Sequence, residues 1–335
     1  MSAAVSAPVA AGAPARPRRS GLLRLVWRQQ RPVLRAWLVV IAVAAVAAPL
    51  LRAAMVSYVD SHHIAGCSLV SLDPACQTDA IQRAVDTFRN GYGRILQGGG
   101  ALLLLLPALV GVFVGAPLLA REFESGTWKL VLTQSVSRTS WVGAKLATAG
   151  AVTLLGSAAL AGLYRWLWLP SANAVSGVYW YSAGFAGSGG PVLVATALLA
   201  LAVGAAAGAV LRRVLPAMAV SLGVVLLLQY LQSGVRPYLV GWHGEVVSRS
   251  DLPDTTWAFA QGFVTPSGER LPYDVCGAAA DPSGCLAKYA GVREFNDVHP
   301  VTDYWPLQGV ESGVCLLLAA ALVVLTLYWT RRRPG

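Results

Sequence analysis

Charged residues are scarce in this chain. Asp, Glu, Lys and Arg make up 13% of its 335 residues, whereas a soluble domain usually carries about 25%. Hydrophobic residues make up 56%, and they gather in runs that exceed the roughly 20 residues a helix needs to cross a bilayer. The composition therefore excludes an ordinary soluble protein and predicts an all-α membrane protein.

Lysine is rarer still, with only Lys129, Lys145 and Lys288 in the whole chain, and none of the three follows a glycine. The sequence thus lacks G-x-x-x-x-G-K-[ST], the loop whose backbone and lysine cradle the phosphates of ATP. We expect no cofactor in this chain and no ATP hydrolysis by it. If it transports actively, a partner subunit must bind the ATP.

The apolar runs also lack Asp, Glu, His and Lys in their central turns. Proton- and sodium-coupled carriers usually hold such residues there, so an ion-coupled mechanism is disfavoured. No base, nucleophile or metal cluster appears on the membrane-facing segments, which disfavours an enzyme acting on lipid. A zinc site at His62, His63 and Cys67 would lack a second ligand cluster.

Six apolar runs predict six transmembrane helices. They are Ala36–Ser57, Gly98–Ala120, Leu146–Leu169, Pro191–Leu211, Val214–Leu231 and Gly309–Trp329. If both termini are cytoplasmic, the inner segments carry sixteen of the 26 basic residues against two acids, Glu122 and Glu124. Cytoplasmic flanks carry such an excess of Lys and Arg. Because these residues line the membrane edge, anionic lipid headgroups are the expected partner and nucleic acid is not.

Four of the five cysteines lie in the expected outer loops. Cys67 and Cys76 are in the first, Cys276 and Cys285 are in the last, and each pair is nine residues apart, while Cys315 lies within a span. Local disulfides in an oxidising compartment fit this distribution. The cysteines thus favour the same orientation as the basic residues. The bias towards Ala, Gly, Val, Leu and Arg favours a GC-rich bacterial genome, so the expected location is a bacterial plasma membrane.

The segments outside the spans divide the chain further. Residues 1–19 form a predicted disordered basic tail, and residues 20–335 form the membrane domain. Leu22, Val26 and Trp27 alternate with arginines, which favours an amphipathic N-terminal interfacial helix, although an ordinary basic flank is the alternative. The outer loops cover about 58–97, with a short helix near Thr78–Leu96, and 232–308, a large extracytoplasmic loop able to form a cap.

Two pairs of glycines have the spacing of a helix-packing motif. Gly111 and Gly115 lie in the second span, and Gly204 and Gly208 lie in the fourth. Glycines four residues apart allow two helices to approach closely in lipid. We expect them at helix contacts, although matches by chance are common in so Gly- and Ala-rich a chain.

The segment between spans two and three, residues 121–145, is too polar to cross a bilayer and too apolar for a plain loop. Glu122 and Glu124 are expected near the start of a cytoplasmic helix, where the helix dipole favours acids. Gly126 can end the preceding turn, and Arg138 and Lys145 are expected to hold inner headgroups. The pattern predicts a rigid element that a cytoplasmic partner can push.

Two motifs resemble those of type-two ABC exporter permeases. Arg121-Glu-Phe-Glu-Ser-Gly-Thr127, followed by Arg138 and Lys145, is similar to the R-E-x-E-x-G-T inner motif of that family. The run from His299 to Glu311 resembles the H-P-x-x-x-x-W-P-x-Q-x-x-E pattern of an actinobacterial branch, with Asp303 where a basic residue is expected.

The resemblance implies a mechanism. Two six-span chains pair, as a homodimer or with a second permease, above two cytoplasmic P-loop ATPase subunits whose closure pushes the inner helices. Coupling would then fall to Glu122, Glu124, Gly126 and Thr127, positioned by Arg121 and Arg138. The competing hypothesis is a non-transporting membrane sensor or anchor with a ligand-binding outer cap. Neither motif names a substrate.

Overall fold

The computed structural model describes residues 31–332 except 70–72, 127–136, 277–283, 286–287 and 290. The predicted tail and nearly all of the predicted interfacial helix lie outside the described residues. Within them, six helical stretches are long and apolar enough to span a membrane: Arg31–His62, Asp79–Ser125, Thr139–Ser171, Pro191–Leu211, Val214–Tyr238 and Val301–Arg332. The prediction of a mostly helical, six-span membrane protein is confirmed.

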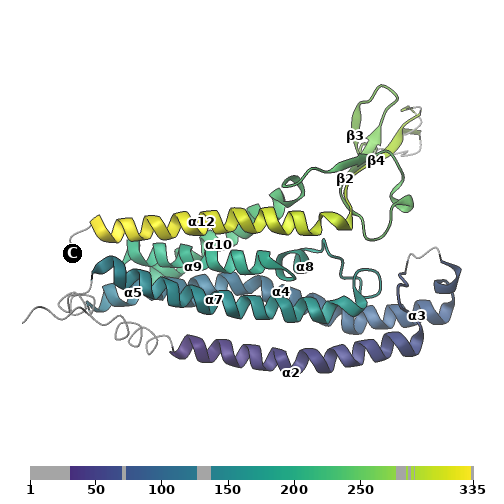
Figure 1. The fold of residues 1–335 in the computed structure, drawn as a ribbon. Coiled ribbons are helices and arrows are strands. Elements are labelled where there is room, and N and C mark those ends of the chain that lie inside the picture. Colours follow the sequence, from purple (N-terminus) through teal and green to yellow (C-terminus); the bar gives the residue numbers. More distant parts are fainter. Residues whose placement is uncertain are drawn as a thin grey trace, which may run out of the picture.

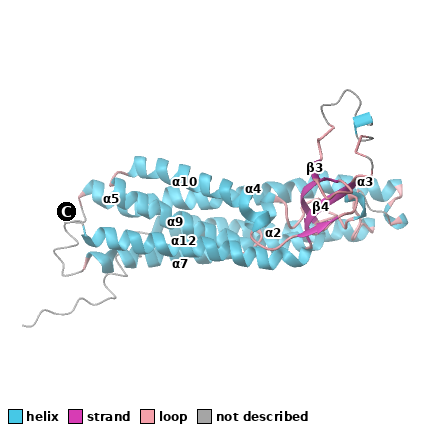
Figure 2. Cartoon of the chain, turned by 90° about the horizontal axis from the view of Figure 1, so that it is seen from above, coloured by secondary structure: helices cyan, strands magenta, loops and turns pink. Residues whose placement is uncertain are grey.

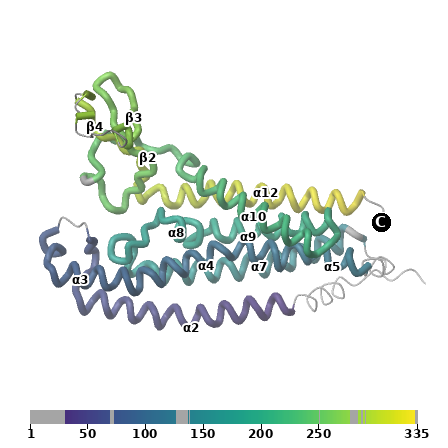
Figure 3. The backbone as a smooth tube through the Cα atoms, turned by 180° about the vertical axis from the view of Figure 1, so that it is seen from behind, coloured from purple at the N-terminus to yellow at the C-terminus, as the bar shows by residue number. Residues whose placement is uncertain are grey.

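The six stretches run side by side as one elongated bundle (Figure 1). One end, which we call the terminal end, carries the C-terminus and the end of α5; the other, the cap end, carries α3 and a small sheet (Figure 3). The helices are α2 (Arg31–His62), α3 (Asp79–Phe88), α4 (Arg94–Val110), α5 (Ala116–Ser125), α7 (Arg138–Trp168), α8 (Ala183–Ser188), α9 (Pro191–Leu211), α10 (Val214–Val235) and α12 (Tyr304–Arg332).

The second span belongs to one helix of 47 residues, Asp79–Ser125. At 1.5 Å per residue it is about 70 Å long, far more than the roughly 30 Å of a bilayer core, so α3 projects beyond the membrane at the cap end. The short helix predicted near Thr78–Leu96 is the first part of it, capped by the Thr78 hydroxyl. π-helical turns at Arg89–Gly93 and Gly111–Gly115 join its three α-helical parts.

α9 is the central helix, and most of its side chains are buried, whereas α2 lies at the edge of the bundle (Figures 1 and 3). The two glycine pairs meet where α9 crosses the second span. A Cβ on Gly204 would collide with the carbonyl oxygen of Gly111, and one on Gly115 would lie 2.6 Å from the carbonyl oxygen of Leu201. The backbones of the two spans therefore touch, which only glycine permits there.

The loop between the fifth and sixth spans carries a four-stranded antiparallel sheet, seen beyond the end of α12 (Figure 2). A cap was predicted for this loop, but its strands were not. The strand order is β1-β4-β2-β3, and the strands are β1 (His243–Glu245), β2 (Trp257–Val264), β3 (Arg270–Pro272) and β4 (Arg293–His299). We call this sheet the cap.

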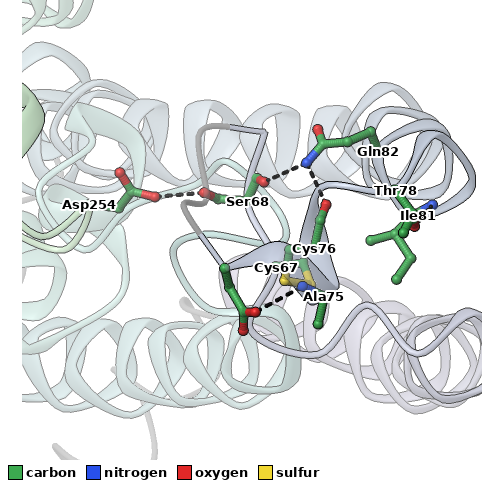
Figure 4. Close-up of a disulfide and its surroundings, with 9 residues drawn as sticks. Cys67, Ser68, Ala75, Cys76, Thr78, Ile81, Gln82 and Asp254 are labelled. Atoms are coloured by element: carbon green, nitrogen blue, oxygen red, sulfur yellow. Dashed lines mark hydrogen bonds between the residues drawn. A yellow bond between two sulfur atoms is a disulfide. The ribbon is translucent and has the colours of Figure 1, made fainter.

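Disulfides join Cys67 to Cys76 and Cys276 to Cys285. Cys67 is therefore not free to act as a zinc ligand. Figure 4 shows the first disulfide with Gln82, whose side-chain amide donates to the Cys76 carbonyl at 2.7 Å, and with Ser68, whose hydroxyl donates to Asp254 at 2.7 Å. The second of these bonds fastens the first loop to the loop that carries the cap.

Candidate functional site

The end of α5 holds Glu122 and Glu124, two of the residues expected to couple to a partner. They were predicted near the start of a helix but lie at the end of one. Glu122 and Glu124 lie in the last turn of α5, and Gly126 follows it in the left-handed conformation with φ +69°. The helix continues this far because Ala, Leu, Arg and Glu are good helix formers and neither Gly nor Pro occurs between Pro117 and Gly126. The negative pole of the helix is unfavourable for acids, so both carboxylates need partners from elsewhere.

Glu122 finds its partner on the third span, where its carboxylate accepts a hydrogen bond from the Lys145 ammonium group in an ion pair. Lys145 is only 5% exposed, and its ammonium group also lies 4.8 Å from the Trp141 ring centroid. Lys145 was expected to hold lipid headgroups, and this expectation is wrong, because the side chain is buried and its ammonium group pairs with Glu122 instead. A buried cation without an anion beside it would be costly. The pair fixes the end of the second span to the third.

Glu124 reaches the fifth span. Its Oε2 accepts a hydrogen bond from the backbone N–H of Val214, the first residue of α10, at 2.9 Å. The first N–H groups of a helix lack partners within it, and its positive pole favours an acid. Glu124 thus caps α10 from another span. Beside it, the Arg212 guanidinium lies 5.6 Å from the Phe123 ring, so the α5 end also meets the turn between spans four and five.

A cavity of about 610 Å³ lies beside this cluster, between α2, the second span and α7. Arg121, Glu122, Ser125 and Lys145 supply its polar lining, and Pro32 and Val33 close its α2 side. Of the other predicted coupling residues, Thr127 lies outside the described residues. Arg138 begins α7, which the Ser137 hydroxyl caps, and the Arg138 side chain is likewise not described. We call Glu122, Phe123, Glu124 and Lys145 the coupling cluster.

The motif from His299 to Glu311 lies at the opposite, cap end and ties α12 to three other elements. The Gln308 side chain accepts from the Val192 N–H and donates to the Ala186 carbonyl, which caps α9 and holds α8. The Glu311 carboxylate forms two hydrogen bonds with the Arg236 guanidinium, at 2.7 and 2.9 Å. Arg236 was not among the predicted site residues, since nothing in the sequence pairs it with a residue 75 positions away.

His299 and Asp303, also in this motif, contact each other at 2.8 Å. The loop between the third and fourth spans joins the same region, because Trp180 donates through its indole N–H to the Thr255 carbonyl at 2.6 Å. The cap end is therefore held by polar contacts among all three loops, and among the described residues no group of three or more His, Cys, Asp or Glu side chains is arranged to hold a metal ion.

Comparison with known proteins accords with this arrangement of six spans. No curated protein and no solved structure matches the chain. A family model described as ABC-2 membrane transporter related matches residues 36–236, more than half of the chain, from the first span through the end of the fifth. The chain therefore belongs to the ABC-2 membrane transporter related family and is a multi-pass membrane protein of the permease type.

Proposed function

We propose that this chain is the membrane-spanning subunit of an ATP-driven ABC exporter. It forms the translocation path and couples to a separate cytoplasmic P-loop ATPase through residues 121–145. The observation that carries the proposal is the coupling cluster, in which one short helix end contacts the third span through Lys145 and the fifth through Val214. A push on this end reaches three spans directly.

The orientation follows from charge and from the disulfides. Arg35, Arg121, Arg213 and Arg331 lie at or near the terminal end, as expected of a cytoplasmic face. The disulfide of the first loop lies at the cap end, as expected in an oxidising compartment. We infer that both termini are cytoplasmic in a bacterial plasma membrane, and that the ATPase binds below the terminal end of two paired permease chains.

In this assembly the partner subunit binds the ATP, because this chain has no P-loop. The residues of this chain transmit motion rather than bind the nucleotide. Glu124 is placed to do so, since it joins a helix end to the first turn of another span and lies at the protein surface.

Substituting Glu124 with lysine tests the coupling role. The change puts a cation at the positive pole of α10 and removes the cap on Val214. We expect a loss of stability of about 1–2 kcal/mol, too small to prevent insertion into the membrane. We expect vanadate-sensitive ATP hydrolysis by the copurified complex to fall about tenfold. A fall of this size corresponds to a coupling free energy within the usual range of about 1–3 kcal/mol. The measurement is ATP hydrolysis per copurified ATPase.

Glu245→Lys is the matched control. It makes the same charge change at an exposed position of β1, at the cap end, and should leave hydrolysis unchanged. Normal hydrolysis and transport in the Glu124 variant would contradict the coupling role. Isolation of the chain with a histidine kinase and without an ATPase would instead favour the sensor or anchor hypothesis.

A further inference from the structure

His299, the last residue of β4, is an ionisable side chain with no exposed surface. Its imidazole packs against two neighbouring aromatic rings of β2, with centroids 5.5 Å away in Trp257 and 5.3 Å away in Phe259. Water cannot satisfy its two ring nitrogens there, so both must find partners within the protein. The coupling cluster, at the other end of the bundle, makes no use of this residue.

Both ring nitrogens of His299 face oxygen atoms. Nδ1 lies 2.8 Å from Oδ2 of Asp303, and Nε2 lies 2.8 Å from the carbonyl oxygen of Pro237. A carbonyl oxygen only accepts, so Nε2 must carry a hydrogen. The contact with Asp303 needs a second hydrogen, on Nδ1 or on the carboxyl group. In either case the pair holds one proton more than a neutral imidazole beside an ionised carboxylate.

Loss of that proton breaks one of the two contacts. A neutral ring has one hydrogen, and the negative charge of Asp303 holds it at Nδ1. Nε2 then presents a lone pair to the Pro237 oxygen, and the two repel. Buried groups without a partner are costly, so the ring and the Pro237 carbonyl move apart.

The contact that is lost joins the cap to the fifth span. Pro237 lies in the turn Arg236–Tyr238 that follows α10, whereas His299 ends β4 and Asp303 directly precedes α12. Arg236, next to Pro237, forms the buried ion pair with Glu311. The imidazole therefore lies where the cap, the fifth span and the sixth span meet.

The other charged groups on the elements around the ring are engaged elsewhere or exposed. On β4 itself, Glu294 accepts a hydrogen bond from the Arg249 backbone N–H, and Arg293 donates to the Val246 carbonyl. Arg236 is paired with Glu311, and Asp297 of β4 is paired with Arg270 of β3. β1, which pairs with β4, carries His243 and Glu245, both exposed.

β2 meets the ring with Trp257 and Phe259, which do not titrate. Behind Trp257 stacks Tyr181, and burial raises the pKa of its hydroxyl, so Tyr181 stays neutral near neutral pH. The group in contact with the ring that can exchange a proton with it is Asp303.

We propose that His299 and Asp303 form a proton-binding site that, when occupied, fastens the cap to the end of α10, and that release of this proton loosens the junction. The occupied state is the one in the structure. His299 acts as a positioning residue: it sets how firmly the cap holds the fifth and sixth spans. This proposal does not depend on the coupling role of the terminal end.

Hydrogen–deuterium exchange of the full chain in lipid nanodiscs tests it, between about pH 5.5 and about pH 8.5, with rates corrected for the intrinsic effect of pH. We expect protection of the backbone amides of β4 and of the turn after α10 to fall roughly five- to tenfold as the pH rises, as for the loss of one buried hydrogen bond. Amides in the middle of α9 should show no such change and serve as the internal reference.

Three variants separate this site from a merely structural role. His299→Gln cannot titrate and should remove the pH dependence. His243→Gln, which changes an exposed histidine of the same sheet, should keep the wild-type profile. Asp303→Asn removes the counter-charge and should move the transition to lower pH. If His299→Gln fails to fold, the Asp303→Asn shift alone decides.

A pH-independent junction in the wild-type protein, or an unshifted transition in Asp303→Asn, would overturn the proposal. Because exchange is measured without an ATPase, its failure would leave the proposed function untouched. Failure of the Glu124 experiment would likewise leave this proton site standing.

Discussion

Gly204→Leu is expected to destabilise the membrane domain by about 3 kcal/mol, the upper end of the usual cost of overpacking. The three heavy atoms nearest to a Cβ at Gly204 all belong to the backbone: the Gly111 carbonyl oxygen, the Ala116 nitrogen at 2.7 Å and the Gly115 carbonyl carbon at 2.9 Å. Backbone atoms cannot rotate aside, so the central α9 must separate from the second span. The measurement is the midpoint of unfolding in a denaturing detergent titration.

Gly223→Leu is the matched control for this change. Gly223 lies on α10, and a Cβ at this position would have no atom of another helix within 4 Å, so we expect its substitution to change the unfolding free energy by no more than about 0.5 kcal/mol. Equal midpoints for the two variants would show that α9 and the second span do not touch at Gly204.

Glu311→Leu is the second large effect that we expect, at about 3–5 kcal/mol, because it leaves the Arg236 guanidinium buried without an anion. The Glu311 side chain is 3% exposed and that of Arg236 is 11% exposed. Removal of both charges in Arg236→Leu/Glu311→Leu should restore most of the lost stability, since a buried ion pair and an apolar pair of similar volume are often equivalent.

A double-mutant cycle of unfolding free energies measures the interaction. We expect each single variant to be much less stable than the double variant. Additive single effects would mean that the two side chains act independently, and that the cap end is held together by its other contacts, such as those of Gln308.

The two buried ion pairs also show why part of the site escaped prediction. The sequence indicates that four charged residues lie at or near the ends of apolar runs: Glu122, Lys145, Arg236 and Glu311. It cannot indicate which of them meet. Glu122 was expected near the start of a cytoplasmic helix because the helix dipole favours acids there. The tertiary contact with Lys145 overrides that preference.

The strands of the cap escaped prediction for a similar reason. β1 and β3 have three residues each, too few for an alternating pattern to stand out. β4 pairs with β1 and β2 across roughly 30 to 55 residues of sequence, so the register depends on long-range pairing. A polar loop rich in Gly and Pro indicates only that the chain leaves the membrane there.

The sequence by itself determined the membrane class, the six spans and the family, because each follows from local composition or from a contiguous motif. The bounds predicted for the fourth span, Pro191–Leu211, coincide with those of α9. Only the tertiary structure decided which charges pair, that Glu124 caps α10, and that His299 lies between two acceptors. These contacts join residues far apart in the chain, and their free energies depend on burial, which no local pattern records.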